Sequence, residues 1–315
     1  MPDDAPIPVA LLTGFLGSGK TTLLSRLLAH PRMGETAVIV NELGEVAVDH
    51  HLLRQVDERT VVLGNGCICC SLRADLADEL RDLLSRRTRG EIPPFRRVVV
   101  ETTGLADPAP ILATLVGEPV VKNHFVLERV ITTVDAMHGL RGEESVRQAV
   151  VADRLVVTKT DVAEAGPLLG ELAALNPLAE VLEVSFGDVE PELLFAGASR
   201  DLRELADLPE VSHGAVEAHS FVLDEELDWS AFGVWLTMLL GARGQDILRV
   251  KGLLDIGGAG PVVLNGVQHV VHPPLHLDAW PDDDRRSRLV FIVRGIERGA
   301  LERSLAAFNG AAAAG

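Results

Sequence analysis

Short apolar runs alternate with helical segments along the first two thirds of the chain. An apolar run over 9–13 precedes a segment over 20–30 whose leucines fall on one helical face. Further apolar runs cover 36–41, 97–101, 125–135, 153–158 and 180–185, and another helical segment covers 71–87. Unbroken Val and Ile runs between helices predict strands buried on both faces. The fold class is therefore α/β, a mostly parallel sheet covered by helices on both faces.

The pattern changes after about residue 205. The stretch 208–216 carries Pro, Gly and polar residues without periodicity, which indicates a domain boundary. Beyond it the pattern predicts strands at 218–223, 247–254, 261–266, 268–272 and 288–294, and helices at 228–241 and 297–308. These elements predict a smaller C-terminal α+β domain with one sheet face covered. We expect a first domain over 1–205, a linker over 206–216, a second domain over 217–310 and a frayed tail over 311–315.

Composition and charge restrict the class of protein. The chain has 315 residues, with 29 Lys and Arg against 46 Asp and Glu, and its net charge of −17 disfavours binding nucleic acid through the overall field. Tyr is absent and aromatic residues make up 4%, so stacking platforms for single strands are lacking. No run approaches the roughly 18 apolar residues of a membrane span, and residues 1–4 are acidic, unlike a secretory signal. We expect a cytoplasmic protein with neither nucleic acid nor membrane as partner.

Residues 14–22, GFLGSGKTT, match the pattern G-x-x-x-x-G-K-[ST] between an apolar strand and an amphipathic helix. Glycines let backbone N–H groups turn toward a phosphate, and the helix N-terminus adds its positive end. Lys20 would reach the β and γ phosphates, and the Thr21 hydroxyl would ligate Mg²⁺. The sequence thus predicts a P-loop NTPase whose phosphate-binding residues are Gly14, Gly17, Ser18, Gly19, Lys20, Thr21 and Thr22.

A second nucleotide element ends the apolar run over 97–101. Glu101 closes the run and Gly104 follows three residues later, as in a Walker B segment. A carboxylate beside the P-loop can hold Mg²⁺, and the Gly104 N–H can reach the γ-phosphate when its loop moves. We take Lys20, Thr21 and Glu101 as the catalytic residues. The alternative for Glu101 is a carboxylate at the solvent boundary of a strand.

Thr158-Lys-Thr-Asp161 follows another apolar run and resembles the N/T-K-x-D element with which GTPases read guanine. The Asp161 carboxylate can accept both N–H donors of guanine, which adenine lacks, while the stem of Lys159 lies along the base. Thr158 stands where Asn is commoner, so one supporting amide is missing. The alternative is that Asp161 is the N-cap of a helix.

All three cysteines, Cys67, Cys69 and Cys70, stand together between a predicted strand and a helix. Thiols beside a helix N-terminus have their thiolate forms favoured, and thiolates are soft ligands for Zn²⁺ or Cu(I). Such a small loop supplies two or three ligands, fewer than the four of a closed structural zinc site. The cluster therefore predicts an open metal site suited to transfer. Small buried residues or a redox pair are the alternatives.

The motifs GFLGSGKTT, VNELGEVAVD, GNGCICC, VVVETTGLADP and TKTD, in this order and before a small α+β domain, resemble the CobW-type GTPases. The resemblance implies slow GTP hydrolysis coupled to delivery of a transition metal, usually zinc and in some members cobalt, to a client metalloprotein. It assigns phosphate and Mg²⁺ binding to the P-loop, phosphate sensing to Glu101 and Gly104, base recognition to Lys159 and Asp161, and metal binding to Cys67, Cys69 and Cys70. Its first switch segment corresponds to 41–45, where Glu42 and Glu45 approach the metal or the nucleotide, or form a solvated loop. Val40 stands where some members have an acidic residue.

These features favour a GTP-hydrolysing metallochaperone that uses GTP, Mg²⁺ and Zn²⁺ or Co²⁺. They are compatible with a homo-oligomer. A P-loop kinase acting on a small molecule is one alternative. Arg86, Arg87 and Arg89 would be the candidate arginines of its acceptor-positioning lid. A GTP-dependent regulatory switch without metal transfer is the other. His269, His272 and His276 are further candidate metal ligands. However, positions 269 and 272 of one strand point to opposite faces.

Overall fold

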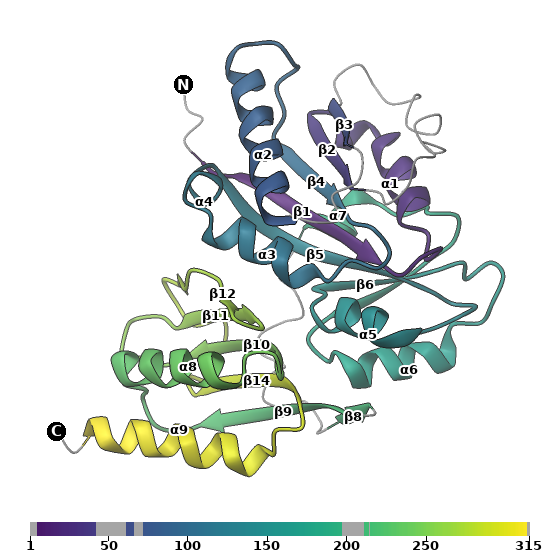
Figure 1. Ribbon diagram of the computed structural model, residues 1–315. Helices are drawn as coiled ribbons and strands as arrows, with labels where there is room; N and C mark the ends of the chain where they lie inside the picture. The colour runs from purple at the N-terminus through teal and green to yellow at the C-terminus, as the bar shows by residue number, and fades with distance from the viewer. Residues whose placement is uncertain (1–4, 42–60, 66–71, 197–210, 214, 314–315) are drawn as a thin grey trace. The chain divides into compact units, whose positions relative to one another are not determined.

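A computed structural model of the protein describes residues 5–41, 61–65, 72–196, 211–213 and 215–313. The chain divides into two compact units, one formed by 1–172 with 179–198 and the other by 173–178 with 199–315 (Figure 1).

The first unit is built on one sheet of seven strands in the order β3-β2-β4-β1-β5-β6-β7 (Figure 1). Every pairing in this sheet is parallel. The strands are β1 Ile7–Gly14, β2 Thr36–Asn41, β3 Val61–Asn65, β4 Arg97–Glu101, β5 Phe125–Asp135, β6 Arg154–Thr158 and β7 Glu180–Val184. The predicted α/β class is confirmed, and β3 is the strand expected before the cysteines.

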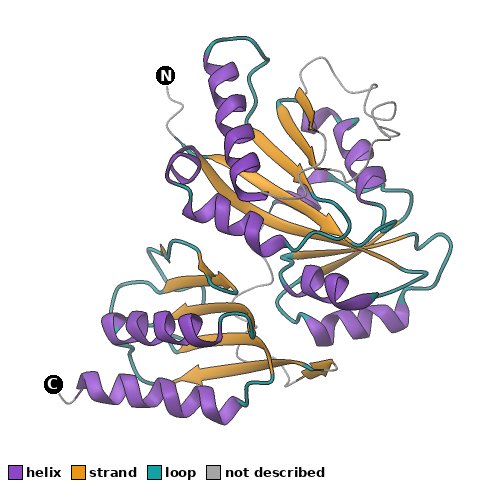
Figure 2. Ribbon diagram, viewed as in Figure 1, coloured by secondary structure: helices purple, strands orange, loops and turns teal. Residues whose placement is uncertain are grey.

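Helices cover both faces of this sheet (Figure 2). They are α1 Lys20–Leu28, α2 Leu72–Thr88, α3 Pro108–Gly117, α4 Pro119–His124, α5 Gly142–Val150, α6 Gly166–Leu175 and α7 Pro191–Phe195, with a 3₁₀ turn η1 at Pro31–Met33. Leucines of α1 and α7 share a buried cluster with Ile131 of β5. Thr132 points to the opposite face, where its hydroxyl donates to the Gln148 carbonyl of α5 over 2.8 Å.

Helix α1 is shorter than the periodicity predicts. The leucine pattern suggested a helix over 20–30, but α1 ends at Leu28. Pro31 follows, and a proline disfavours the helical conformation in the residue before it. His30 accordingly has an extended backbone, with φ −80° and ψ 134°.

The second unit contains an antiparallel sheet in the order β12-β11-β10-β14-β9-β8, with β13 paired to β11. Its strands are β8 Val211–His213, β9 Val216–Leu223, β10 Ile247–Leu254, β11 Val262–Val267, β12 Val270–Val271, β13 Leu275–His276 and β14 Ser287–Arg294. Its helices are α8 Trp229–Arg243 and α9 Arg298–Ala313.

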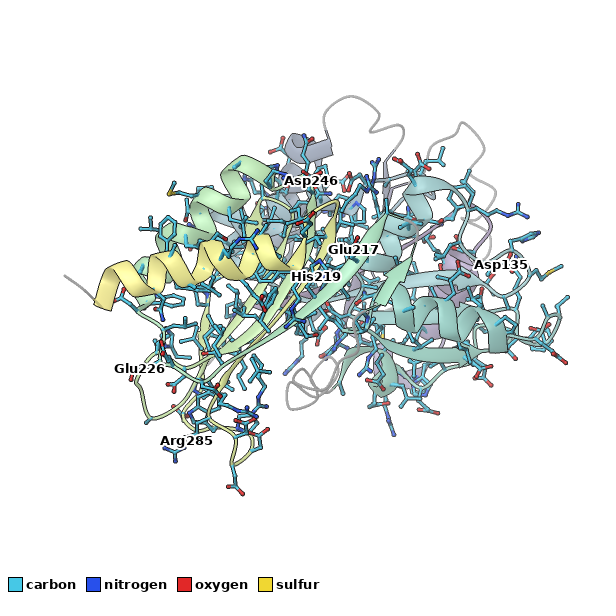
Figure 3. The ribbon with its side chains drawn as sticks, turned by 90° about the horizontal axis from the view of Figure 1, so that it is seen from below. Asp135, Glu217, His219, Glu226, Asp246 and Arg285 are labelled. Atoms are coloured by element: carbon cyan, nitrogen blue, oxygen red, sulfur yellow. The ribbon has the colours of Figure 1, made fainter. Side chains whose placement is uncertain are left out.

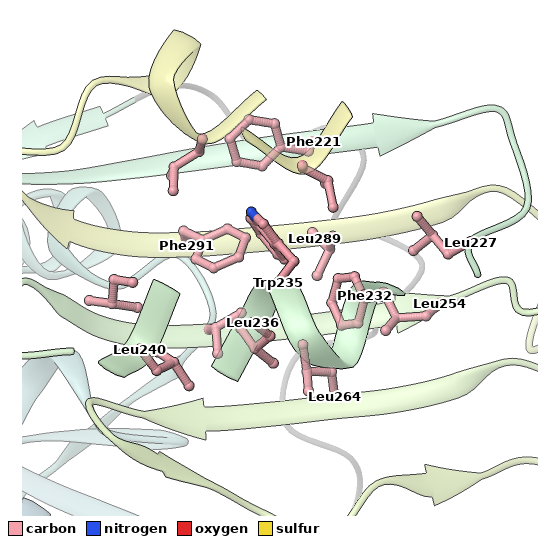
Figure 4. Packing of buried hydrophobic residues seen from close by; sticks show 14 of the residues in the cluster. Phe221, Leu227, Phe232, Trp235, Leu236, Leu240, Leu254, Leu264, Leu289 and Phe291 are labelled. Carbon is pink, nitrogen blue, oxygen red and sulfur yellow. The ribbon is translucent and has the colours of Figure 1, made fainter. Parts of the chain in front are cut away.

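Helices α8 and α9 pack on the same face of this sheet (Figure 4). The Trp235 ring of α8 meets the Phe291 ring of β14 edge to face, with centroids 6.0 Å apart. The indole N–H of Trp235 donates to the Ser304 hydroxyl of α9 over 3.1 Å, which satisfies its one polar atom. The predicted C-terminal α+β layer is therefore present.

Three expectations for this half of the chain need correction. Strand β8 lies inside the stretch 206–216, which was expected to be a linker. The strand expected at 268–272 is reduced to β12 because Gln268 has a φ of +50° and turns the chain. Helix α9 continues to Ala313, although a frayed tail was expected from residue 311. Alanine is the best helix former, which explains the longer helix. None of the described helices is long and apolar enough to cross a membrane.

Candidate functional site

The predicted P-loop joins the end of β1 to the first turn of α1. Gly14 has a φ of +143°, and a Cβ atom there would lie 2.3 Å from the Thr133 hydroxyl oxygen. Gly19 precedes α1 with a φ of +91°. Only glycine accepts such positions without strain, and together they lead the chain into the helix N-terminus, whose free N–H groups favour an anion.

Lys20 folds back over this loop. Its ammonium donates to the carbonyl oxygens of Gly14 over 2.8 Å and Phe15 over 3.1 Å. The side chain is 8% exposed, so these contacts hold a buried cation at the loop. Phosphate oxygens would be charged acceptors for the Lys20 ammonium. Hydrogen bonds to charged acceptors are stronger than those to neutral carbonyls.

Thr21 and Glu101 come together at the ends of neighbouring elements. Strands β1 and β4 pair with Leu12 opposite Glu101, which places this carboxylate beside the P-loop. The Thr21 hydroxyl donates to Glu101 Oε1 over 2.8 Å, and Glu101 is 4% exposed. A hydroxyl and a carboxylate side by side are hard oxygen donors, the kind that Mg²⁺ prefers.

The loop after β4 lies directly against the P-loop. A Cβ atom on Gly104 would be 2.5 Å from the backbone nitrogen of Leu16. From α5, the side-chain amide of Gln148 donates to the carbonyls of Gly104 over 3.1 Å and Ala106 over 3.0 Å. Gln148 is fully buried and belongs to no motif, so no sequence signal pointed to it.

These residues surround a cavity of about 520 Å³, within the range of ligand sites. Of the predicted site residues, Gly17, Gly19, Lys20, Thr21, Thr22, Glu101, Gly104 and Lys159 line it, together with Leu16, Val40, Thr102, Thr103 and Leu105. Ser18, by contrast, is buried and its hydroxyl lies 2.6 Å from that of Thr133. Its side chain thus braces the loop against β5.

The loop predicted to read the base is tied to the P-loop by Thr158. Its hydroxyl donates to the Ser18 carbonyl over 2.7 Å, a contact that explains a threonine at this position. Asp161 is exposed and lies in the turn after β6, and helix α6 begins only at Gly166. The alternative of Asp161 as the N-cap of that helix is therefore wrong.

Lys159 has a left-handed backbone, with φ +60°, and its side chain is held by Asp135, the last residue of β5. Asp135 is labelled in Figure 3. The Lys159 ammonium lies 2.5 Å from Asp135 Oδ2, and His138 Nδ1 lies 2.8 Å from the same oxygen. Burial alone would raise the pKa of Asp135, but hydrogen bonds from Lys159, His138 and the Met137 N–H outweigh it and lower that pKa. Asp135 is thus a charged anchor for the lysine, and it belongs to none of the sequence motifs.

We expect Asp135→Asn to lower the free energy of unfolding by about 1–3 kcal/mol at pH 7, because Lys159 loses its charged partner. The folded carboxyl has a lowered pKa, so its stabilisation is complete above the unfolded value of about 3.9 and is lost as the pH falls through the folded value. Urea unfolding from pH 7 to acid pH should therefore show the gap to wild type closing at low pH. Asp161→Asn, in an exposed position, is the control.

A gap that persists unchanged below the folded pKa of Asp135 would contradict a charge-based anchor. It would indicate that the substitution disturbs packing instead.

The remaining predicted site residues divide into two groups. Cys67, Cys69, Cys70, Glu42 and Glu45 lie outside the described residues. The three C-terminal histidines are described, and each meets its own neighbour. His269 Nδ1 lies 2.9 Å from the Leu240 carbonyl oxygen, His272 Nδ1 lies 3.2 Å from the Asn265 amide nitrogen, and the His276 ring meets that of Trp229. No cluster of three metal-ligating side chains occurs in the described part of the chain.

Residues 8–183 match the CobW/HypB/UreG nucleotide-binding domain, and residues 216–309 match the cobalamin synthesis protein CobW C-terminal domain. The chain belongs to the CobW family. Zinc chaperone YjiA of Escherichia coli K12 is 38% identical over 308 residues, covering 91% of this chain and 94% of its own. Zinc chaperone CobW of Pseudomonas aeruginosa is 30% identical over 349 residues, covering 96% and 91%.

The CobW-family fold is also seen in a crystal structure of Zn(II)-bound YjiA GTPase from E. coli. It superposes with a TM-score of 0.76 at 32% identity, covering 96% of this chain and 99% of that one. Family membership and the P-loop cavity together make this chain a P-loop GTPase. The arginines that suggested a kinase have local partners, since Arg86 pairs with Asp82, Arg89 pairs with Glu91 and Arg87 lies over the Phe95 ring.

Proposed function

We propose that this CobW-family GTPase is a metallochaperone that binds zinc through Cys67, Cys69 and Cys70 and delivers it to a client metalloprotein under control of the GTP/GDP state. Relatives named zinc chaperones support the choice of zinc, and one relative from fission yeast is named a zinc-regulated GTPase metalloprotein activator. The three thiols are ligands that zinc prefers. Incomplete coordination by so small a loop suits a cargo that must leave.

Nucleotide binding follows from the cavity. We assign Lys20 to the β and γ phosphates and the helix α1 N-terminus to the same anionic groups. Thr21 and Glu101 would hold Mg²⁺, directly or through a water, and this ion would neutralise charge that develops on the phosphates. Asp161 and the stem of Lys159 would read the guanine base, with Thr158 keeping their loop against the P-loop.

The coupling of nucleotide to metal is supported by strand register. In the parallel sheet Val40 lies opposite Glu101, and Asn41 lies opposite Asn65. Neighbouring strands are about 4.8 Å apart, so Asn65 ends β3 roughly 10 Å from Glu101 across the sheet. Cys67 is two residues further along the chain, which can add at most about 7 Å.

This register is the observation that carries the proposal. β2 and β3 end at Asn41 and Asn65, on the edge of the sheet where Val40 and Glu101 line the nucleotide cavity, and Glu42 and the cysteines follow these two strand ends in the sequence. Gly104 stands at the same edge, held by Gln148, and its loop is the described element best placed to respond to a γ-phosphate. Occupancy of the triphosphate site would thereby be transmitted to the thiols.

We expect the zinc affinity to be at least about 10-fold higher with Mg²⁺ and a non-hydrolysable GTP analogue than with Mg²⁺ and GDP, a factor within the ordinary range of coupling between two sites. Competition with a chromogenic zinc chelator measures it. The control is the triple variant Cys67→Ser, Cys69→Ser and Cys70→Ser, in which the difference should disappear while GDP binding remains.

Equal zinc affinities in the two nucleotide states would reject metal delivery under GTP control. If the triple serine variant still regulated its client in a nucleotide-dependent manner, the chain would be a regulatory switch without metal transfer.

A further inference from the structure

Helix α8 of the second unit exposes an uncharged surface. Between its N-cap, Asp228, and its last residue, Arg243, the helix carries no charged side chain. Surface helices place charged or polar residues opposite the core, and a helix that is apolar all round is normally buried. Yet Val234 is 54% exposed and Met238 is 59% exposed. This side of α8 therefore has the composition of a covered surface.

An apolar groove runs along α8. Its volume is about 540 Å³, similar to that of the phosphate cavity of the first unit. One wall is α8, and the other is formed by β11, β12 and the chain that follows them. None of the described residues along the groove is an Asp, Glu, Lys or Arg. Six of the lining residues show this apolar character, and three of them are labelled in Figure 4: Trp229, Leu236, Leu240, Leu264, Val271 and Pro274.

The exposed apolar side chains of the second unit gather at this groove. In the described part of that unit, the exposed large apolar residues are Trp229, Val234, Met238 and Leu275. Three of them belong to α8, and Leu275 follows Pro274, which lines the groove. Single exposed apolar residues are normal, but a contiguous group of them marks an interaction site.

The groove also offers a hydrogen-bonding group and open space. His269 Nδ1 donates to the Leu240 carbonyl over 2.9 Å, so Nε2, which bonds none of the described residues, is left to face a ligand. Gly233 and Gly241 of α8 line the groove on either side of Thr237. A Cβ atom at either glycine would meet nothing within 4 Å, so side chains of a partner have room there.

Charge at the two ends of the groove indicates the kind of partner. The segment 224–228, DEELD, stands directly before α8 and carries four carboxylates and no basic residue. One of them, Asp224, lies 3.5 Å from Arg286. At the other end of the helix, Arg243 pairs with Asp246 over 2.6 Å. The end where α8 begins is thus negative and the other end is neutral, which favours a partner with positive charge at one end.

We propose that this groove docks a segment of a partner protein that carries apolar side chains followed by Lys or Arg. The apolar side chains would fill the groove beside Leu236 and Leu240, and the basic residues would lie over the segment 224–228. Amphipathic segments bind apolar grooves in this manner. The α8 helix of a second copy offers only Arg243, which is already paired, so it does not supply this charge. The inference goes beyond the proposed function, whose nucleotide and zinc assignments concern residues of the first unit.

Synthetic peptides of about four helical turns test the groove. Two of them share leucines at i, i+3, i+4 and i+7, and carry either lysines or glutamates at the other positions. We expect the full-length protein to bind the lysine peptide at least about 10-fold more tightly than the glutamate peptide. A lysine peptide with serine in place of leucine should bind weakly, which separates the groove from general attraction to a chain of net charge −17. Fluorescence anisotropy of labelled peptides measures all three.

Gly233→Glu fills the groove without disturbing the helix, because a Cβ atom there meets nothing within 4 Å and Glu is a better helix former than Gly. We expect it to weaken binding of the lysine peptide at least about 10-fold, although its added negative charge alone would strengthen that binding. Gly170→Glu on α6 adds the same charge at a helical glycine with equally open space, and is the matched control. Thr237→Glu, at an exposed groove position, is a second variant in case the first does not fold.

Equal affinities of the lysine and glutamate peptides would overturn the inference, as would a wild-type protein that binds neither of them. Folded Gly233→Glu and Thr237→Glu proteins that bind the lysine peptide as the Gly170→Glu control does would also overturn it. Sedimentation that shows a dimer of the chain alone, lost in Gly233→Glu, would assign the groove to a second copy and reject a partner protein. These outcomes leave GTP hydrolysis and zinc affinity untouched, so they are distinct from a failure of the proposed function.

Discussion

We expect Lys20→Ala to abolish GTP hydrolysis, with kcat/KM for GTP falling by about 10³-fold or more, the scale on which a cation at the transferring phosphoryl group acts. The ammonium now bonds to the carbonyls of Gly14 and Phe15 inside the cavity wall. Alanine leaves nothing at this place to neutralise the β and γ phosphates. Steady-state phosphate release at saturating and subsaturating GTP measures the change.

Lys122→Ala is the control for charge, since Lys122 is exposed on α4 and lies outside the cavity lining. It should hydrolyse GTP at the wild-type rate. Thermal unfolding of both variants separates a catalytic loss from a loss of fold. Turnover within tenfold of wild type in a folded Lys20→Ala protein would exclude this lysine from the phosphate site.

We expect Gly104→Ala to slow GTP hydrolysis by about 10²–10³-fold, the effect of removing one preorganised donor from a developing charge. A Cβ atom on residue 104 would meet the Leu16 backbone nitrogen at 2.5 Å and the Leu16 Cα at 2.7 Å. Because backbone atoms of the P-loop cannot give way, the loop after β4 must move outward. Its N–H then no longer reaches a γ-phosphate.

Binding measurements distinguish this cause from general damage. GDP has no γ-phosphate, so its affinity should change much less than that of a non-hydrolysable GTP analogue. Gly117→Ala provides the control, because a Cβ atom at the end of α3 meets nothing within 4 Å. A Gly104→Ala protein that still prefers the GTP analogue as wild type does would show that this glycine takes no part in sensing.

The positions of the P-loop and of the carboxylate beside it could be predicted from the sequence. The spacing from Gly14 to Lys20 and Thr21 is set by one short turn between a strand and a helix, so a local motif suffices to predict it. Glu101 could be assigned because a run of valines ends at a carboxylate, and a parallel sheet brings the carboxyl ends of its strands together.

Residues that act from other elements escaped that reasoning. Asp135 holds Lys159 from a strand 24 residues earlier, and Gln148 holds the Gly104 loop from α5, 44 residues later. Neither position carries a distinctive neighbourhood in the sequence. Their roles exist only because β5, β6 and α5 are adjacent in the folded sheet.

The sequence by itself determined the alternation of strands and helices, the P-loop, the Walker B carboxylate and the family, because each depends on residues close together along the chain. Only the tertiary structure decided which polar groups hold these motifs in place. It also showed that Asp161 is not the N-cap of helix α6, and that Phe186, in the loop after β7, lies beside the predicted base-reading loop. Those contacts join strands whose order in the sheet differs from their order in the chain, so no local pattern encodes them.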